Sequence, residues 1–349
     1  MDERSLLLCL CRHEPGDEVR RHLSAGAAVD WQLVHDLAQR HDLLPLLHDG
    51  LNSSGLLDSG ACPPTFLSGL EGRRYATAMT NALFAEERDK ISTELESRQI
   101  PVMLLKGAVL AERVYDDVSL RPFTDLDLVI HPEHRQDLKQ ILQAMGYRHL
   151  EREKKEEDYY IRTLQPSSGR LLRFWIDVHH QMDTNMRRRG RRFPFEEIWR
   201  DSQPWLSECC RHPCWEDILC HVATHASLDS YPRFILICDT DAIVRKREDL
   251  DWDRAVDKAQ RYHAATDLWI ALHLAQSLMD APVPAAVLDR LRPGAIRQLV
   301  IERFLNERTI LDKRAGTRSR YLFRLATTDR LTDLPDMLLR AMALAWRAR

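Results

Sequence analysis

Two aspartates separated by a single residue are the side chains of this chain best suited to chemistry. Asp125 and Asp127 lie in TDLDLVI, residues 124–130, where polar and apolar residues alternate. The alternation predicts a strand, in which residues two apart leave the same face with Cα atoms roughly 6–7 Å apart. Two such carboxylates can hold two hard cations, Mg²⁺ or Mn²⁺, which assist phosphoryl-type transfer. An ordinary exposed strand face is the alternative interpretation.

A third carboxylate would complete the cation site, and Asp177 is the candidate. It lies near the end of LLRFWIDVH, residues 171–179, whose apolar and aromatic content predicts another strand. Asp177 could bind the first cation and help to orient or deprotonate an acceptor hydroxyl. His179 leaves the same strand face, so it could contact the acceptor or a phosphate. A structural hydrogen bond explains His179 equally well.

A lysine–glycine pair occupies the junction between a predicted buried strand, residues 100–105, and a predicted helix, residues 108–115. Backbone N–H groups at such a helix N-terminus favour phosphate. Gly107 would let the phosphate approach closely, and Lys106 would add a positive charge. An ordinary lysine at a strand end is the alternative. Arg121, in LRPFTD, could reach a triphosphate or fix its loop by pairing with an acid.

The surrounding elements predict an α/β core between two helical regions. A helix over residues 131–145 separates the strand at 124–130 from the strand at 171–179, so strands and helices alternate. Residues 1–95 and 201–349 carry apolar residues at helical spacing. We therefore expect an N-terminal helical region (1–95), a core with a small mixed sheet (96–200) and a C-terminal helical domain (201–349), α+β overall.

Composition restricts the partners. The hydrophobic share of 44% and the charged share of 30% are typical of globular proteins, and a net charge of −3 gives no global attraction for nucleic acid. The basic run Arg187–Arg192 could dock an anionic acceptor such as RNA or a phosphorylated peptide, although a solvated loop is the safer interpretation. No stretch approaches the ~20 apolar residues that cross a bilayer. We expect a cytoplasmic protein with no membrane partner.

Cysteines and histidines offer weaker candidate sites. The densest of the eight cysteines form CCRHPC, residues 209–214, which could bind zinc but fits free thiols in a reducing cytosol better. His221 and His225 have the four-residue spacing of a zinc-binding helix. The peptidase pattern requires glutamate at 222, where this chain has valine. We expect both histidines to line a cleft against the α/β unit.

Several of these stretches together resemble a known family. The combination of LLKG, RPxxDLDL and IDVH, with the helical segments before and after it, resembles a poorly characterised nucleotidyltransferase family of bacteria within the polymerase-beta-like superfamily. The resemblance implies that Asp125 and Asp127 are metal ligands and that Asp177 is the third carboxylate. It covers nearly the whole chain.

The resemblance also extends to the phosphate loop and the helical domain. Gly107 takes the place of the glycine in the superfamily's Gly-Ser motif, and Ala108 stands where the serine hydroxyl would contact phosphate, so Lys106 would replace that contact. Arg233 and Asp239 match helical-domain positions that pair with each other or face the nucleotide. The predicted nucleotide-binding residues are Lys106, Gly107, Ala108, Arg121 and Thr124.

These observations lead to a specific expected reaction. An acceptor attacks the α-phosphorus of a nucleoside triphosphate with two Mg²⁺ ions present, nucleoside monophosphate is transferred and pyrophosphate leaves. The acceptor could be a peptide, a protein, RNA or a small molecule, and the resemblance fits tailoring of a peptide or small natural product. Two alternatives remain: a non-catalytic nucleotide- or partner-binding module, and a toxin–antitoxin-type nucleotidyltransferase that docks RNA on Arg187–Arg192.

Overall fold

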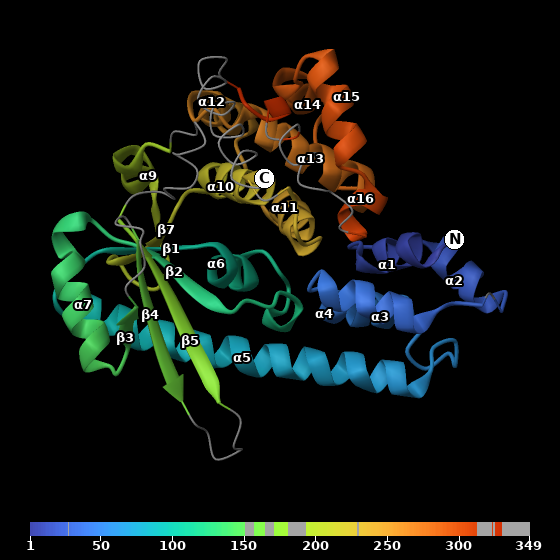
Figure 1. Cartoon of the computed structure of the whole chain (residues 1–349), viewed down its shortest axis with the longest axis horizontal. Coiled ribbons are helices and arrows are strands. Elements are labelled where there is room, and N and C mark those ends of the chain that lie inside the picture. Colours follow the sequence, from blue (N-terminus) through green and yellow to red (C-terminus); the bar gives the residue numbers. More distant parts are fainter. Residues whose placement is uncertain are drawn as a thin grey trace, which may run out of the picture. The chain divides into compact units, whose positions relative to one another are not determined.

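The computed structural model describes residues 1–26, 28–150, 157–164, 171–180, 193–228, 230–312, 323 and 325–329. The described residues form two compact units (Figure 1). The first, the helical unit, contains Met1–Ala76 and the described part of Leu219–Arg349. The second, the sheet unit, contains the described parts of Thr77–Arg188 and Phe193–Ile218. The division into 1–95, 96–200 and 201–349 stays a prediction.

The sheet unit is built on a seven-stranded mixed sheet with the order β3-β4-β5-β2-β1-β7-β6. Strands β2 and β5 pair in parallel, as do β1 and β7, and the other neighbours are antiparallel. The fold class predicted from the sequence, a mixed-sheet α/β core flanked by helical regions, is confirmed. The strands are β1 Val102–Leu105, β2 Asp125–Val129, β3 Arg148–Leu150, β4 Glu157–Leu164, β5 Leu172–His179, β6 Gln203–Pro204 and β7 Cys210–His212.

The three predicted strands correspond to β1, β2 and β5, whereas β3, β4, β6 and β7 were not expected. Strand β7 runs through the cysteine-rich segment, where the Ser92 hydroxyl donates to Cys210 Sγ at 3.2 Å and both residues are buried. All eight cysteines are free thiols. The segment thus supplies a strand, parallel to β1, to the same sheet as the aspartates.

Helices cover the sheet face opposite to the one that bears Asp125 and Asp127. Phe84 of α5 contacts Phe174 of β5 with ring centroids 5.0 Å apart. Arg135 at the start of α7 pairs with Asp158 of β4, and the Glu87 carboxylate of α5 accepts from Arg162 of the same strand. The helices that contribute to this unit are α5 Pro64–Ser97, α6 Lys106–Arg113, η1 Val118–Leu120, η2 Pro132–His134, α7 Arg135–Ala144 and α9 Phe195–Asp201.

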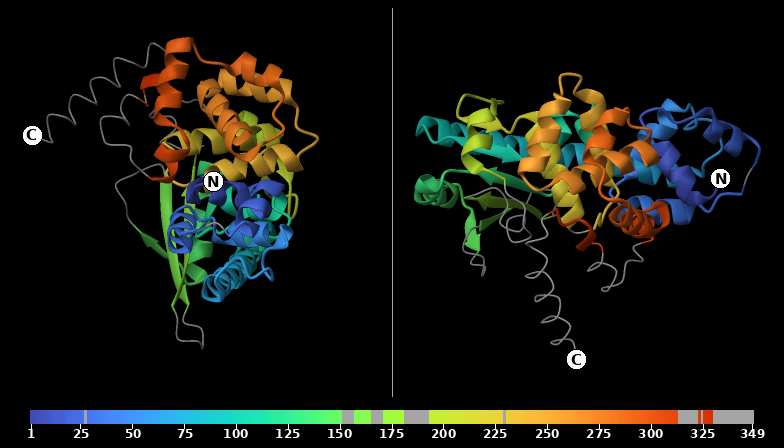
Figure 2. Two further views of the ribbon diagram at one scale, coloured as in Figure 1. Left: turned by 90° about the vertical axis from the view of Figure 1, so that its right-hand side faces the viewer. Right: turned by 90° about the horizontal axis from the view of Figure 1, so that it is seen from above.

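In the helical unit, helix α13 is central, because α1, α11, α12 and α14 all contact it (Figures 1 and 2). Ten of its fifteen residues are buried, including Trp269, so it forms the core of the unit. No helix in the described part of the chain is long and apolar enough to cross a membrane. The helices are α1 Glu3–Cys11, α2 Asp17–Ser24, α3 Trp31–Arg40, α4 Leu44–Ser53, α10 Trp215–Leu228, α11 Ile235–Lys246, α12 Trp252–Arg261, α13 Ala265–Met279, α14 Ala285–Leu291, α15 Ala295–Phe304 and α16 Glu307–Leu311.

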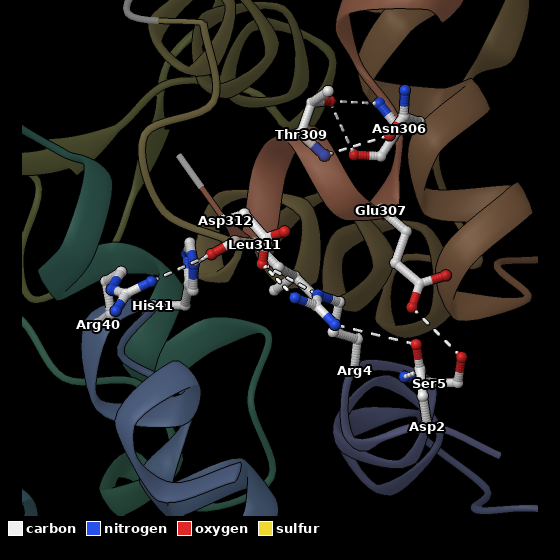
Figure 3. A network of polar contacts seen from close by, with 10 residues as sticks. All are labelled: Asp2, Arg4, Ser5, Arg40, His41, Asn306, Glu307, Thr309, Leu311 and Asp312. Carbon is white, nitrogen blue, oxygen red and sulfur yellow. Dashed lines mark hydrogen bonds and ion pairs between the residues drawn. The ribbon is translucent and has the colours of Figure 1, made fainter. Parts of the chain in front are cut away.

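Polar contacts join the first helices of the helical unit to α16, which lies far along the sequence (Figure 3). Arg4 pairs with Asp312 at 2.8 Å, and the His41 ring lies 2.9 Å from the Leu311 carbonyl oxygen. A capping box between Asn306 and Thr309 starts α16. Because His41 is completely buried, this end of α16 is held by an interaction shielded from water.

Candidate active site

The sheet register places Asp127 beside Asp177. In the parallel pairing of β2 with β5, Asp127 is the direct partner of Asp177, so their side chains leave the same face of the sheet. Asp125 leaves that face as well, since it lies two residues from Asp127. Leu126 and Leu128 point to the opposite, helix-covered face and are at most 2% exposed. The alternation seen in the sequence therefore builds a face with three carboxylates.

Asp127 is buried and is held by two cationic or polar partners. Lys106 Nζ lies 2.7 Å from Asp127 Oδ1, and His179 Nε2 lies 3.1 Å from the same oxygen. Burial alone would raise the pKa of Asp127, but the Lys106 ammonium and the hydrogen bond from His179 hold that pKa well below its usual range. Lys106 thus acts as the counter-ion of Asp127 in this state.

Asp177 has the opposite electrostatic character. Burial, followed by the negative charges of Asp127 and Asp125, raises the pKa of Asp177 to about 6. No residue in the described part of the chain forms a hydrogen bond or ion pair with its carboxylate. Like charges this close favour proton uptake or a bound cation. Asp177 is therefore the carboxylate whose charge is least compensated.

The donor set fits a hard divalent cation, although the side chains are not arranged around one. Mg²⁺ and Mn²⁺ prefer carboxylate oxygens, which Asp125, Asp127 and Asp177 supply from one face. As the described side chains stand, no three His, Cys, Asp or Glu residues are gathered in a way that would hold a metal ion. Cation binding at this face would require the carboxylates to turn and Lys106 to move from Asp127.

The junction of β1 and α6 combines backbone strain with close packing. Lys106 has a left-handed backbone with φ of 52°, which is unfavourable for a residue with a side chain. A Cβ atom on Gly107 would lie 2.6 Å from Phe123 Cβ, so only glycine fits there. Glycine is required at position 107 because Phe123 packs against it, independently of any role in admitting a phosphate. Leu105 at the N-cap of α6 makes no side-chain capping bond.

Arg121 and Thr124 flank this junction, in the loop that leads to β2. The Arg121 guanidinium lies next to Gly107, since a Cβ there would be 3.4 Å from Arg121 Nη1. Arg121 Nη1 donates to the Pro122 carbonyl at 2.7 Å. Asn81 of α5 fixes the loop by donating to the carbonyls of Val118 and Arg121. Thr124 is exposed directly before β2, and Ala108 is buried within α6.

Comparison with known proteins assigns the chain to a family. The sequence profile of a family described as uncharacterised nucleotidyltransferases matches residues 27–280, which is more than two thirds of the chain. The chain belongs to this nucleotidyltransferase family. No curated protein matches it. Among solved structures, it is similar to an antigenic nucleotidyltransferase-like protein from Paracoccidioides brasiliensis, at 15% identity over 62% of this chain and 95% of that one. The TM-score of 0.38 is too low for this likeness to support any argument.

In this member of the nucleotidyltransferase family, four predicted site residues lie in the helical unit. Arg233 pairs with Asp42 at 2.6 Å instead of with Asp239, so the first of the two expected arrangements is not seen, and the alternative that they face the nucleotide stays a prediction. Asp239 is completely buried within α11. His221 and His225 stack on α10 with ring centroids 6.5 Å apart, and their place beside the α/β unit stays a prediction. Arg187–Arg192 lie outside the described residues.

Sequence reasoning missed two residues on the same sheet face as the aspartates. In the antiparallel pairing of β4 with β5, Glu157 is the partner of His179 and Tyr159 is the partner of Asp177. The Tyr159 hydroxyl donates to Glu157 Oε2, and both residues are buried. The signal in the sequence was Glu157-x-Tyr159, with the two-residue spacing of a strand face. A polar row therefore extends across β2, β5 and β4.

Proposed function

We propose that this chain transfers a nucleoside monophosphate from a nucleoside triphosphate to an acceptor and releases pyrophosphate. The observation that carries the proposal is the parallel register that sets Asp127 beside Asp177, with Asp125 on the same face. The nucleotidyltransferase family supports the class of reaction. Asp125, Asp127 and Asp177 would hold two Mg²⁺ or Mn²⁺ ions, which would neutralise phosphate charge and polarise the reacting phosphorus.

The residues around the carboxylates would bind the phosphates and orient the reacting groups. Lys106, Arg121 and the N-terminus of α6 would bind the phosphates, because they place positive charge at one junction. The acceptor hydroxyl would lose its proton to the Asp177 carboxylate as its oxygen bonds to the α-phosphorus. The bond from that phosphorus to the bridging oxygen of the β-phosphate breaks, and pyrophosphate leaves. His179 would orient Asp127.

The acceptor remains the open part of the proposal. A peptide, a protein, RNA or a small molecule would each present a hydroxyl or a phosphate to the polar row. We favour a peptide or a small natural product, on the resemblance described from the sequence. An RNA acceptor would dock through Arg187–Arg192, and replacing three of these arginines would then weaken transfer and reduce its dependence on salt.

One observation favours a second candidate function, a non-catalytic nucleotide-binding module. Lys106 already neutralises Asp127 at 2.7 Å, and the described side chains are not gathered around a metal. Such a protein would bind a nucleotide at the β1–α6 junction without transferring any part of it. The two candidates differ in whether pyrophosphate is released.

The test combines binding and turnover. Titration calorimetry with each nucleoside triphosphate, with and without Mg²⁺, measures nucleotide affinity. Incubation with α-³²P-labelled triphosphates and cell extract then measures label transfer and pyrophosphate release. Asp125→Asn and Asp127→Asn should abolish release, whereas Asp137→Asn, an exposed aspartate on α7, should not change it. Nucleotide binding without any release in the unaltered protein would support the binding module instead.

A further inference from the structure

Helix α15 is poorly covered in the helical unit. Six of its ten residues are apolar (Ala295, Ile296, Leu299, Val300, Ile301 and Phe304), yet within the described structure Ile301 alone is buried. Ile296 is 81% exposed and Leu299 is 69% exposed. A ten-residue helix is marginal in water unless it packs against something. The exposure of two large aliphatic side chains on one short helix therefore needs an explanation.

The two exposed residues and the half-buried Val300 form one stripe. Successive residues of a helix are rotated by about 100°, so Ile296, Leu299 and Val300 project from one side of α15, with the exposed Arg303 at its C-terminal end. Ile301 projects from the side that packs on the unit. Arg297 lies between these two sides, next to the stripe. Figure 1 shows α15 beside α14 at the edge of the helical unit.

The chain returns to this position just before its C-terminal segment. Arg297 Nη2 lies 3.0 Å from Asp329 Oδ1, and Arg297 Nε donates to the Ala326 carbonyl at 2.8 Å. The backbone N–H of Thr266 donates to Asp329 Oδ2 at 3.1 Å. Residue 329 is therefore fixed against α13 and α15, on the flank of the exposed stripe. Residues 330–349 follow and lie outside the described residues.

The sequence of the C-terminal segment fits the stripe in length and character. Residues 331–349, LTDLPDMLLRAMALAWRAR, carry apolar residues at helical spacing, including Leu334, Leu338 and Met342. Because Pro335 fits only the first turn of a helix, a helix here would span the fifteen residues 335–349 and extend about 22 Å, compared with about 15 Å for the ten residues of α15. The segment is thus long enough to cover the stripe from its starting point at Asp329.

We infer that the stripe of Ile296, Leu299 and Val300 is the docking surface of this chain's own C-terminal segment, residues 331–349. A tethered segment that starts beside the stripe has a local concentration on the order of millimolar, so it competes well with a second molecule. The inference is independent of the proposed function. It depends on the helical unit alone.

A photo-crosslinking experiment on the full chain tests this assignment. Leu299 is replaced by p-benzoylphenylalanine, which an exposed position accepts, and the irradiated protein is digested with trypsin. The expected product is an intrachain crosslink from α15 to the peptide 331–340 or 341–347. The matched control carries the same group at Tyr75, which is 65% exposed on α5, and should not label these peptides. A crosslink between two copies, at twice the mass, would overturn the inference, as would labelling of neither peptide.

A second measurement follows the backbone of α15. Leu338→Asp combined with Met342→Asp should make the amides of residues 299–304 exchange with deuterium about tenfold faster, because the variant segment would leave the stripe. Arg340→Asp is the control within the same segment and should change the exchange much less. Equal exchange in the unaltered chain and in the double variant would show that another surface covers α15 or that none does.

Discussion

Lys106 Nζ lies 2.7 Å from Asp127 Oδ1, and Lys106 is 19% exposed while Asp127 is 4% exposed. Removing one member of such a buried pair leaves an uncompensated charge, which costs about 3–5 kcal/mol. We expect Lys106→Met to lower the free energy of unfolding by about that amount in metal-free buffer. The measurement is urea denaturation followed by circular dichroism.

The same variant tests cation binding at this face. If Mg²⁺ binds the aspartates, millimolar Mg²⁺ should restore much of the stability that Lys106→Met loses, because the ion would replace the lost positive charge. Lys139→Met, on α7, should show neither the loss nor the recovery. Recovery with NaCl of equal ionic strength would point to screening instead of a bound cation.

Replacing Gly107 or Gly72 with alanine should change the stability of the protein in opposite directions. A Cβ on Gly107 would lie 2.6 Å from Phe123 Cβ, so Gly107→Ala should destabilise the protein by about 1–3 kcal/mol through overpacking. A Cβ on Gly72, within α5, would meet nothing within 4 Å. Gly72→Ala should therefore stabilise the helix by about 0.5–1 kcal/mol. Thermal denaturation of the two variants measures both, and two shifts of equal sign would contradict the packing argument.

Asp241 gives the helical unit a specific pH dependence. Burial raises the pKa of Asp241 to about 6, even though Arg245 lies 2.8 Å away and opposes the shift. The folded state therefore binds a proton more tightly than the unfolded state, in which the pKa is near 3.8. The resulting stability is fully present below that value and is lost as the pH rises through about 6. The loss is on the order of 3 kcal/mol.

The comparison of the unaltered protein with Asp241→Asn isolates this contribution. Asparagine does not titrate. The unaltered protein should therefore lose unfolding free energy relative to Asp241→Asn as the pH rises from 4 to 6.5. Denaturant titrations at several pH values supply that difference. A difference that stays constant over this range would mean that Asp241 is ionised in the folded protein at acidic pH.

Asp158 should stabilise the sheet from the face opposite to the candidate site. Its carboxylate accepts from Arg135 Nε at 2.7 Å and lies 2.9 Å from His149 Nε2 and 2.7 Å from His180 Nε2. Asp158→Asn should lower the free energy of unfolding by about 1–3 kcal/mol, because Arg135, His149 and His180 lose their carboxylate partner; water, which reaches the half-exposed Arg135, reduces the cost. If the proposed site is correct, nucleotide affinity should change much less than stability. Calorimetric titration of the folded variant checks this.

The candidate site was largely readable from the sequence because a strand has a strict period of two. The alternation in TDLDLVI and the position of Asp177 predicted which carboxylates share a face, and the register agrees. Strand β4 was missed because its first five residues are all buried and the adjacent Glu157 and Asp158 break the alternation, which leaves Glu157-x-Tyr159 as a weak signal. Strand β7 has only three residues, too few to show a period.

Contacts between distant parts of the sequence could not be predicted in this way. Arg233 pairs with Asp42, 191 residues earlier, and no local pattern links them. The need for glycine at 107 depends on Phe123, which packs there only once β2 has joined the sheet beside β1. Periodicity reports which side of an element is buried, whereas the identity of the partner depends on the tertiary fold.

The order of the two units along the chain bears on how the protein is made. The helical unit is discontinuous, with the sheet unit inserted between Ala76 and Leu219. Helix α1, whose Leu6, Leu7 and Leu10 are at most 1% exposed in the finished fold, contacts α13 and α16. A ribosome needs on the order of tens of seconds to synthesise the intervening residues. During that interval the leucines of α1 lack part of their cover, so the emerging N-terminus is the segment that we expect nascent-chain chaperones to bind.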